Sequence, residues 1–227
     1  MSVAHPIPHD SGTLHVTGAA RYVDDIPTPA NAVHLAFGLS TVARGCVTTM
    51  DLDPVRAAPG VIAVWTADDL PNRCDVSPSN HDEPLLSDGS VHYVGQPMFL
   101  VVATSHGAAR RAAVLAEVAY DEETPILTVE QALAADSRFE DGPRVWTKGD
   151  VDAALDAAPH RIRGRIEIGG QEHFYLEGQA ALALPNEGDM LVHSSTQHPT
   201  EIQHKVAEAL HRPMSDVRVE IDRKSVV

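Results

Sequence analysis

The chain has 227 residues, of which 43% are hydrophobic but only 4% aromatic, and its formal net charge is −15. This length allows one large or two modest domains with a substantial core, which we expect to be packed by Ala, Val and Leu rather than by aromatic clusters. The acidic balance excludes nucleic acid as an expected partner, because binding phosphates requires a basic face.

Other features narrow the class of protein further. No run of about eighteen uninterrupted apolar residues occurs, so no membrane span is predicted. The start of the chain, from Met1 to Pro6, lacks a basic region followed by an apolar core, so no export signal is predicted and a cytoplasmic protein is expected. Cys46 and Cys74 are the only cysteines. They are too few to hold an iron–sulfur cluster by thiolates, and we interpret them as reduced, buried thiols.

The first half of the chain predicts a domain that mixes helices and strands. Residues 1–17 carry no periodicity and are predicted as an arm, and a turn-rich entry runs from Gly18 to Pro29. Alternation and short apolar runs predict strands at 32–43, 61–65, 98–103 and 118–120. Helices are predicted at 53–58, with Asp53 as N-cap and Pro54 at the first helical position, from Thr66 with Asp69, and at 106–118.

Residues 71–92 interrupt this pattern. They contain Pro71, Pro78 and Pro84, several Asp and Asn residues, and little periodicity, so a long surface loop is predicted. Such a loop is uncommon in a compact domain, and we therefore expect it to contact a partner or a neighbouring domain.

The second half predicts a connection followed by a second domain. The capping-box spacing from Thr128 to Gln131 predicts a short helix through Ala135. Further helices are predicted at 149–157 and 199–211, and strands at 161–168, 174–184, 190–196 and 217–221. The expected division is an arm at 1–17, a first domain at 18–127, a connection at 128–148 and a second domain at 149–227.

The stretch from Gly170 to Glu177 concentrates polar groups beside bulky apolar residues. Glu172 and Glu177 suggest a carboxylate pair for acid and base catalysis. Positions five apart on an extended strand point to opposite faces, which disfavours a shared pocket. We therefore interpret Glu172 and His173 as polar anchors at a domain junction.

A metal held by protein side chains is also disfavoured. Successive members of a set of four histidines are separated by five, six and seven residues, which matches no compact zinc spacing. The set consists of His193, His198, His204 and His211.

Gln197 is singled out by its position. It ends a predicted strand and precedes Pro199 and a predicted helix, so its amide can project from the carboxyl edge of a sheet. Open α/β sheets bind their ligands at that edge. A glutamine at a strand end is usually a cap or loop residue, so position alone leaves both interpretations open.

Several segments together resemble the molybdenum-binding large subunit of the xanthine dehydrogenase and aldehyde oxidase family. Gly169–Glu177 is the most specific of these segments, and Ser195-Thr196-Gln197-His198-Pro199 follows it at the expected distance. The segments before them, in the expected order, are Gly18–Asp25, Ala58-Pro59-Gly60-Val61, Thr66–Asp69 and Gly95-Gln96-Pro97. The resemblance covers nearly all of residues 12–221. It implies an α+β chain, with an α/β hammerhead domain followed by the beginning of a mixed α/β molybdenum-cofactor-binding domain.

The resemblance also implies a function. In the family, a glutamine at the position of Gln197 hydrogen-bonds an oxygen bound to molybdenum, and a neutral amide can do so without changing the charge at the metal. Family chemistry is hydroxylation of a purine such as xanthine or hypoxanthine, with a glutamate as general base. Electrons pass to iron–sulfur clusters and FAD on other domains or on a small subunit, and finally to NAD or oxygen. A hetero-oligomer is therefore expected.

The end of the chain departs from the resemblance. After Val217–Ile221 a relative continues into a glycine-rich loop around a Phe-Gly pair, whereas this chain reads Asp222–Val227. The general-base glutamate and the remaining pterin-binding loops are not matched. No catalytic residue is therefore assigned, and no cofactor is expected to be bound to this chain alone.

Two hypotheses stay open. The chain is either a subunit that contributes Gln197 to a cofactor pocket completed elsewhere, or an inert truncated piece that serves as a folded or subunit-binding module. An aldehyde or isoquinoline oxidoreductase is the alternative to a purine enzyme.

Overall fold

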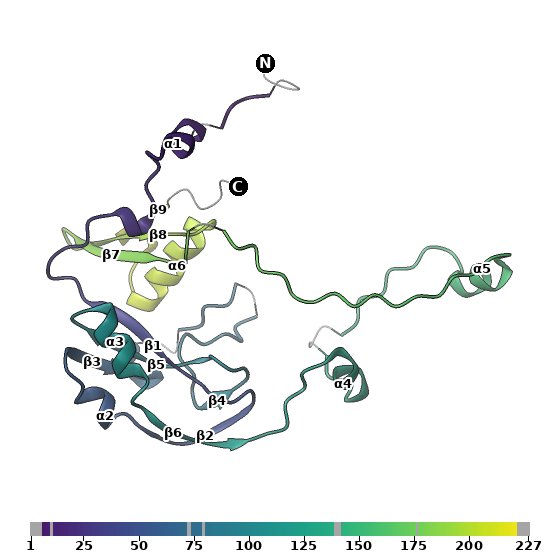
Figure 1. Ribbon diagram of the computed structural model, residues 1–227, viewed down its shortest axis with the longest axis horizontal. Helices are drawn as coiled ribbons and strands as arrows, with labels where there is room; N and C mark the ends of the chain where they lie inside the picture. Colours follow the sequence, from purple (N-terminus) through teal and green to yellow (C-terminus); the bar gives the residue numbers. More distant parts are fainter. Residues whose placement is uncertain are drawn as a thin grey trace. The chain divides into compact units, whose positions relative to one another are not determined.

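The computed structural model describes residues 6–9, 11–71, 74–78, 80–138, 142–175 and 177–221 (Figure 1). The chain divides into two compact units. The larger is formed by Met1–Thr124 with Tyr175–Val227, and the smaller by Pro125–Phe174. The chain contains both helices and strands, in mixed order, which confirms the α+β class. In the described part of the chain, no helix is both long enough and apolar enough to cross a membrane.

Two antiparallel sheets form the first part of the larger unit. One has the order β1-β5-β3, with β1 (His34–Leu39), β5 (Pro97–Ala103) and β3 (Val61–Trp65). The other has the order β4-β2-β6, with β4 (Ser90–Val91), β2 (Gly45–Asp51) and β6 (Glu117–Glu122). The apolar run of β5 makes it the central strand of its sheet, and the strands expected at 61–65, 98–103 and 118–120 are confirmed. The strand expected at 32–43 is shorter.

Helix α3 (His106–Ala113) covers one face of the β1-β5-β3 sheet (Figure 1). Its small buried residues Ala108, Ala109 and Ala112 let the helix lie close against buried Phe99 and Val101 of β5. The helix is shorter than the 106–118 expected, because the residues from Glu117 onward pair with β2 as strand β6.

Four short helices complete this part: α1 (Gly12–Thr17), η1 (Val23–Asp25), α2 (Asp53–Arg56) and η2 (Ala67–Asp69). Helix α1 corrects the expected arm. Gly18 ends it with a left-handed backbone at φ 71°, which glycine adopts without strain. Helix η2 forms where Thr66 and Asp69 predicted it, and the side chain of Asp69 accepts a hydrogen bond from the amide of Thr66 at 2.7 Å.

Two local predictions in this region were wrong. The N-cap of α2 is Leu52 rather than Asp53, because Asp53 already has helical geometry at the start of the helix. Cys46 is exposed on strand β2, whereas Cys74 is buried as expected.

The predicted surface loop at 71–92 is largely built into the fold. Cys74, Ser77, Leu86 and Ser87 are buried, and Asp75 forms an antiparallel bridge with Pro84. The carboxylate of Asp75 accepts hydrogen bonds from the amide and hydroxyl of Ser77 and from the amide of Glu83. Burial works to raise the pKa of Asp75, but these hydrogen bonds outweigh it and lower the pKa below its ordinary value of 3.8.

The C-terminal part of the larger unit is a sheet with the order β7-β8-β9. Strands β7 (Ala181–Asn186) and β8 (Asp189–Ser194) form a hairpin whose turn residues Glu187 and Gly188 both have positive φ, as a tight hairpin turn requires. Helix α6 (Pro199–Leu210) then leads to β9 (Val217–Ile221), which pairs parallel with β8, after the short helix η3 (Met214–Asp216). The strand at 217–221 and the helix at 199–211 are confirmed.

Helix α6 covers one face of this sheet. Its Ile202, Val206 and Ala207 pack with Val192 of β8 and Val217 of β9. Lys205, on the same helix, donates a hydrogen bond from Nζ to the backbone oxygen of Asp75 at 2.8 Å. The C-terminal sheet is therefore connected to the 71–92 segment, which was expected to contact a neighbouring domain.

The smaller unit contains the helices α4 (Val129–Ala134) and α5 (Val151–Ala157). Both start as their sequences predict, because Thr128 caps α4 in a capping box and Asp150 caps α5.

One expected strand is absent from the described residues, and another is shorter than expected. Residues 161–168 alternate as a strand does, but no segment of the described chain pairs with them, and Ile162 is fully exposed. The strand expected at 174–184 begins only at Ala181, and Phe174 is exposed. Leu176 and residues 222–227 lie outside the described residues.

The substitution Val101→Asp tests the position of the main core. Val101 is fully buried on β5, so an unpaired carboxylate there should cost at least about 4 kcal/mol of unfolding free energy. Urea unfolding followed by circular dichroism measures the loss. Leu35→Asp, on the half-exposed face of the neighbouring strand β1, is the matched control and should be much milder. An unchanged midpoint for Val101→Asp would contradict the assignment of β5.

The substitution Asp75→Asn tests the hydrogen bonds that fold the 71–92 segment. At neutral pH it should lower the unfolding free energy by about 1 kcal/mol, because a charged acceptor is lost. The folded pKa of Asp75 is lowered, so its contribution is present above the unfolded pKa and is lost as the pH falls through the folded pKa. Wild type and variant should therefore converge in acid. A difference that is constant with pH, or that also appears for the exposed neighbour Asp82→Asn, would contradict this role.

Candidate functional site

Glu177 connects two segments that are far apart in the sequence. Its side chain is only 6% exposed, and its Oε1 accepts a hydrogen bond from the backbone amide of Val23 at 3.0 Å, across 154 positions. Val23 begins helix η1, and the first amides of a helix have no partner within it. The side chain of Asp25 accepts from the amide of Tyr22 at 2.9 Å. One carboxylate from the turn and one from a distant segment therefore satisfy the amides at this helix start.

This arrangement corrects the expectation for the Gly170–Glu177 stretch. Glu172 and His173, expected as polar anchors, are both exposed and belong to the smaller unit. Glu177 is the residue that anchors this stretch, through its hydrogen bond with the amide of Val23. The two glutamates differ because Glu172 lies in a solvated segment without regular structure, whereas Glu177 lies directly before the C-terminal sheet.

Ser195, directly after the end of β8, pairs with Ala180, directly before the start of β7. Its backbone amide donates to the oxygen of Ala180 at 3.0 Å, and its hydroxyl oxygen accepts from the amide of Ala180 at 2.8 Å. The residue is buried. Both hydrogen bonds fix the chain at the point where it leaves β8.

Gln197 lies where the sequence placed it, between the end of β8 and the start of α6. The surrounding loop is held at both sides, because Ser195 binds Ala180 and the hydroxyl of Thr196 accepts from the amide of His198 at 3.1 Å. Gln197 itself is exposed. Its amide therefore sits at the carboxyl end of the parallel strands β8 and β9, with a donor and an acceptor open to a ligand.

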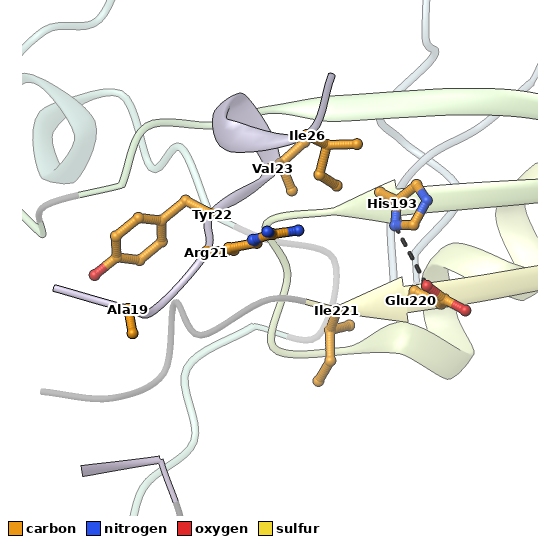
Figure 2. Close-up of a pocket in the computed structure, with 8 residues that line it drawn as sticks. All are labelled: Ala19, Arg21, Tyr22, Val23, Ile26, His193, Glu220 and Ile221. Carbon is orange, nitrogen blue, oxygen red and sulfur yellow. Dashed lines mark ion pairs between the residues drawn. The ribbon is translucent and has the colours of Figure 1, made fainter. Parts of the chain in front are cut away.

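A cavity of about 580 Å³ lies between the opening segment Ala19–Ile26 and the sheet (Figure 2). Nδ1 of His193 and Oε2 of Glu220 are 3.5 Å apart on its sheet side. These two residues pair with each other in the sheet and lie on the face opposite α6, because Val192 and Val219, which precede them on the two strands, pack on the helix side. Gln197 is not among the lining residues, which are Ala19, Arg21, Tyr22, Val23, Ile26, His193, Glu220 and Ile221.

The histidines do not form a metal site in the described chain. His193 pairs with Glu220, while His198, His204 and His211 are exposed. No group of three or more metal-ligating side chains occurs among the described residues.

Sequence reasoning missed Ser195 as a support for Gln197 and missed the partner of Glu177. Both residues lie in segments that carried the resemblance. Their contacts span 15 and 154 positions, and no local periodicity reports contacts at such separations.

Comparisons with known proteins match both parts of the chain. A family model described as "Aldehyde oxidase and xanthine dehydrogenase, a/b hammerhead domain" matches residues 17–124, and one described as "Molybdopterin cofactor-binding domain" matches residues 133–224. Xanthine dehydrogenase of Drosophila subobscura is 39% identical over 214 residues, which are 93% of this chain and 16% of that protein. Aldehyde oxidase 4 of Mus musculus is 37% identical over 224 residues, which are 97% of this chain and 16% of that protein. The chain thus spans about one sixth of the length of these relatives.

Solved structures share the fold. Quinoline 2-oxidoreductase from Pseudomonas putida 86 matches with a TM-score of 0.81 and 22% identity, over 98% of this chain and 30% of that chain. Aldehyde oxidoreductase from Desulfovibrio gigas matches with a TM-score of 0.79 and 23% identity, over 95% of this chain and 26% of that chain. The expected architecture, a hammerhead domain followed by part of a molybdenum-cofactor-binding domain, is confirmed.

Proposed function

The chain belongs to the xanthine dehydrogenase and aldehyde oxidase family of molybdenum hydroxylases, and from this premise we propose that it is part of an oxidoreductase that hydroxylates xanthine or hypoxanthine. The observation that carries the proposal is the placement of Gln197. Its free carboxamide stands at the carboxyl end of parallel strands, in a segment matched by the cofactor-binding family model. The purine specificity is supported by xanthine dehydrogenases at 37–40% identity.

The residues present fit a molybdenum–pterin group at this position. Gln197 is exposed and lies in a loop held by the buried Ser195, so its amide is accessible and its backbone is held in place. A neutral amide donates a hydrogen bond without adding charge next to the metal. When bound, the group supplies the redox chemistry of hydroxylation. Gln197 contributes binding and orientation only.

Gln197 cannot hold such a group by itself. One neutral hydrogen bond is worth about 1 kcal/mol, whereas association costs several kcal/mol. No second residue of the described chain is assigned to the cofactor, and no general base is assigned. The remaining contacts must therefore come from polypeptide outside the described residues, and we propose that this chain alone binds no cofactor.

We further propose that the complete enzyme is a cytoplasmic hetero-oligomer whose small subunit carries the iron–sulfur clusters and FAD. Cys46 is exposed and Cys74 buried, one on strand β2 and the other in the 71–92 segment, so they are not placed as a cluster-binding set. Neither nucleic acid nor a membrane is a proposed partner, because the chain carries a net charge of −15.

A second candidate function is a folded module that only binds other subunits. The exposed apolar side chains of the smaller unit favour it, since Trp146 and Phe174 are each 93% exposed and Ile162 is fully exposed. Apolar side chains left open in this way mark surfaces that other protein covers. Aldehyde oxidases at 37% identity keep an aldehyde substrate as the alternative to a purine.

Metal analysis tests the first part of the proposal. The purified 227-residue chain, produced in cells that make the molybdenum cofactor, should contain far less than one molybdenum atom per chain and show no xanthine-dependent reduction of NAD or of artificial acceptors. Molybdenum near one atom per chain would contradict the proposal that the pocket is completed elsewhere.

Substitution of Gln197 in the assembled enzyme tests the second part. Gln197→Ala should lower kcat with xanthine by about 10- to 100-fold, which is typical for loss of a hydrogen bond around a metal site. The melting temperature should not change, because the side chain is exposed. Gln171→Ala, at another exposed glutamine outside the segments that support Gln197, is the matched control and should retain activity. Equal turnover of the wild type and Gln197→Ala would remove the site assignment.

A further inference from the structure

Two sets of hydrogen bonds, linked by the chain from Glu177 to Ala180, connect the opening segment to the loop that carries Gln197. The amide of Val23 donates to Glu177, and three residues later Ala180 exchanges hydrogen bonds with Ser195. Ser195 stands two positions before Gln197. The network therefore joins the three segments 18–26, 177–180 and 195–198, which local structure alone does not bring together.

The two side chains that make these hydrogen bonds are buried. Glu177 is 6% exposed and Ser195 is 4% exposed. A buried carboxylate needs donors, and the first amide of helix η1 needs an acceptor from outside the helix. The hydrogen bond between them therefore holds the opening segment and the approach to β7 in one arrangement.

We infer that Glu177 and Ser195 are positioning residues for Gln197, an inference that rests on the proposed function of that glutamine. Neither side chain is proposed to touch cofactor or substrate. Ser195 sets the path of the chain as it leaves β8, and Glu177 fixes the segment to which Ser195 is bonded. The opening segment thereby restrains the orientation of the Gln197 carboxamide through two intermediate contacts.

Amide hydrogen exchange on the purified chain tests the coupling without any cofactor. In Glu177→Gln, exchange should accelerate at least tenfold at Val23 and also at Thr196 and His198, while Val101 in the main core keeps its protection. Ser195→Ala should accelerate exchange at Ala180, Thr196 and His198. The side-chain amide resonance of Gln197 should shift in both variants. The matched controls are Glu172→Gln and Ser215→Ala, at exposed positions, and they should leave the Gln197 loop unchanged.

The double variant distinguishes an effect of Glu177 that passes through Ser195 from a general loss of stability. If Glu177 acts through Ser195, then Glu177→Gln with Ser195→Ala should accelerate exchange at Thr196 and His198 no more than the stronger single variant does. Independent, multiplied effects would overturn the inference, as would an effect of Glu177→Gln confined to Val23.

Val23→Pro provides a second route if Glu177→Gln fails to fold. It removes the donated amide, at a helix start where proline is tolerated, and replaces the buried valine side chain by another apolar one. It should reproduce the exchange pattern of Glu177→Gln. An unaltered Gln197 loop in Val23→Pro would overturn the inference.

The proposed function is tested separately by turnover of Gln197→Ala. If exchange is coupled in Glu177→Gln but turnover of Gln197→Ala is unchanged, the proposed function is contradicted. If turnover of Gln197→Ala is reduced but exchange is not coupled, only the present inference is contradicted.

Discussion

The placement of the opening segment against the C-terminal sheet depends on the hydrogen bond between the carboxylate of Glu177 and the amide of Val23. Val23 opens a short helix, whose first amides have no acceptor within the helix, and Glu177 is buried where the chain enters the C-terminal sheet. Their pairing holds the opening segment over strands β8 and β9. The cavity in front of His193 and Glu220 follows from that placement (Figure 2).

The same logic explains why a single glutamine can be oriented without being buried. Gln197 has no core contacts to fix it, but the loop around it is bounded by the buried Ser195 on one side and by Pro199 at the first turn of α6 on the other. Helix α6 is in turn packed on Val192 and Val217. A rigid sheet and helix thus present an exposed amide, which is how rigid elements commonly display functional groups.

The sequence predicted those parts of the fold that local patterns determine. The apolar run of β5, the alternation of β9 and the capping box at Thr128 each specify their element within a few residues. The place of Gln197 between a strand and a helix could be read in the same way. Its proposed role, by contrast, rests on the family resemblance, because a strand-end glutamine is chemically ordinary.

Contacts between residues far apart in the sequence determine the structure of the segments that local patterns predicted wrongly. Residues 161–168 have the period of a strand, but a strand needs a neighbour, and none is found among the described residues. Glu172 and Glu177 look alike in the sequence, and only the distant Val23 distinguishes them. The 71–92 segment has the composition of a loop, yet its carboxylate Asp75 and the contact from Lys205 fold it against the rest of the unit.

An experimental structure of the assembled enzyme with its cofactor bound would test the central claim most directly. The account predicts that the carboxamide nitrogen of Gln197 lies at about 2.9 Å from an acceptor atom of the cofactor, with Glu177 still accepting the amide of Val23. A Gln197 side chain directed away from the cofactor, with the hydrogen bond between Glu177 and Val23 intact, would contradict it.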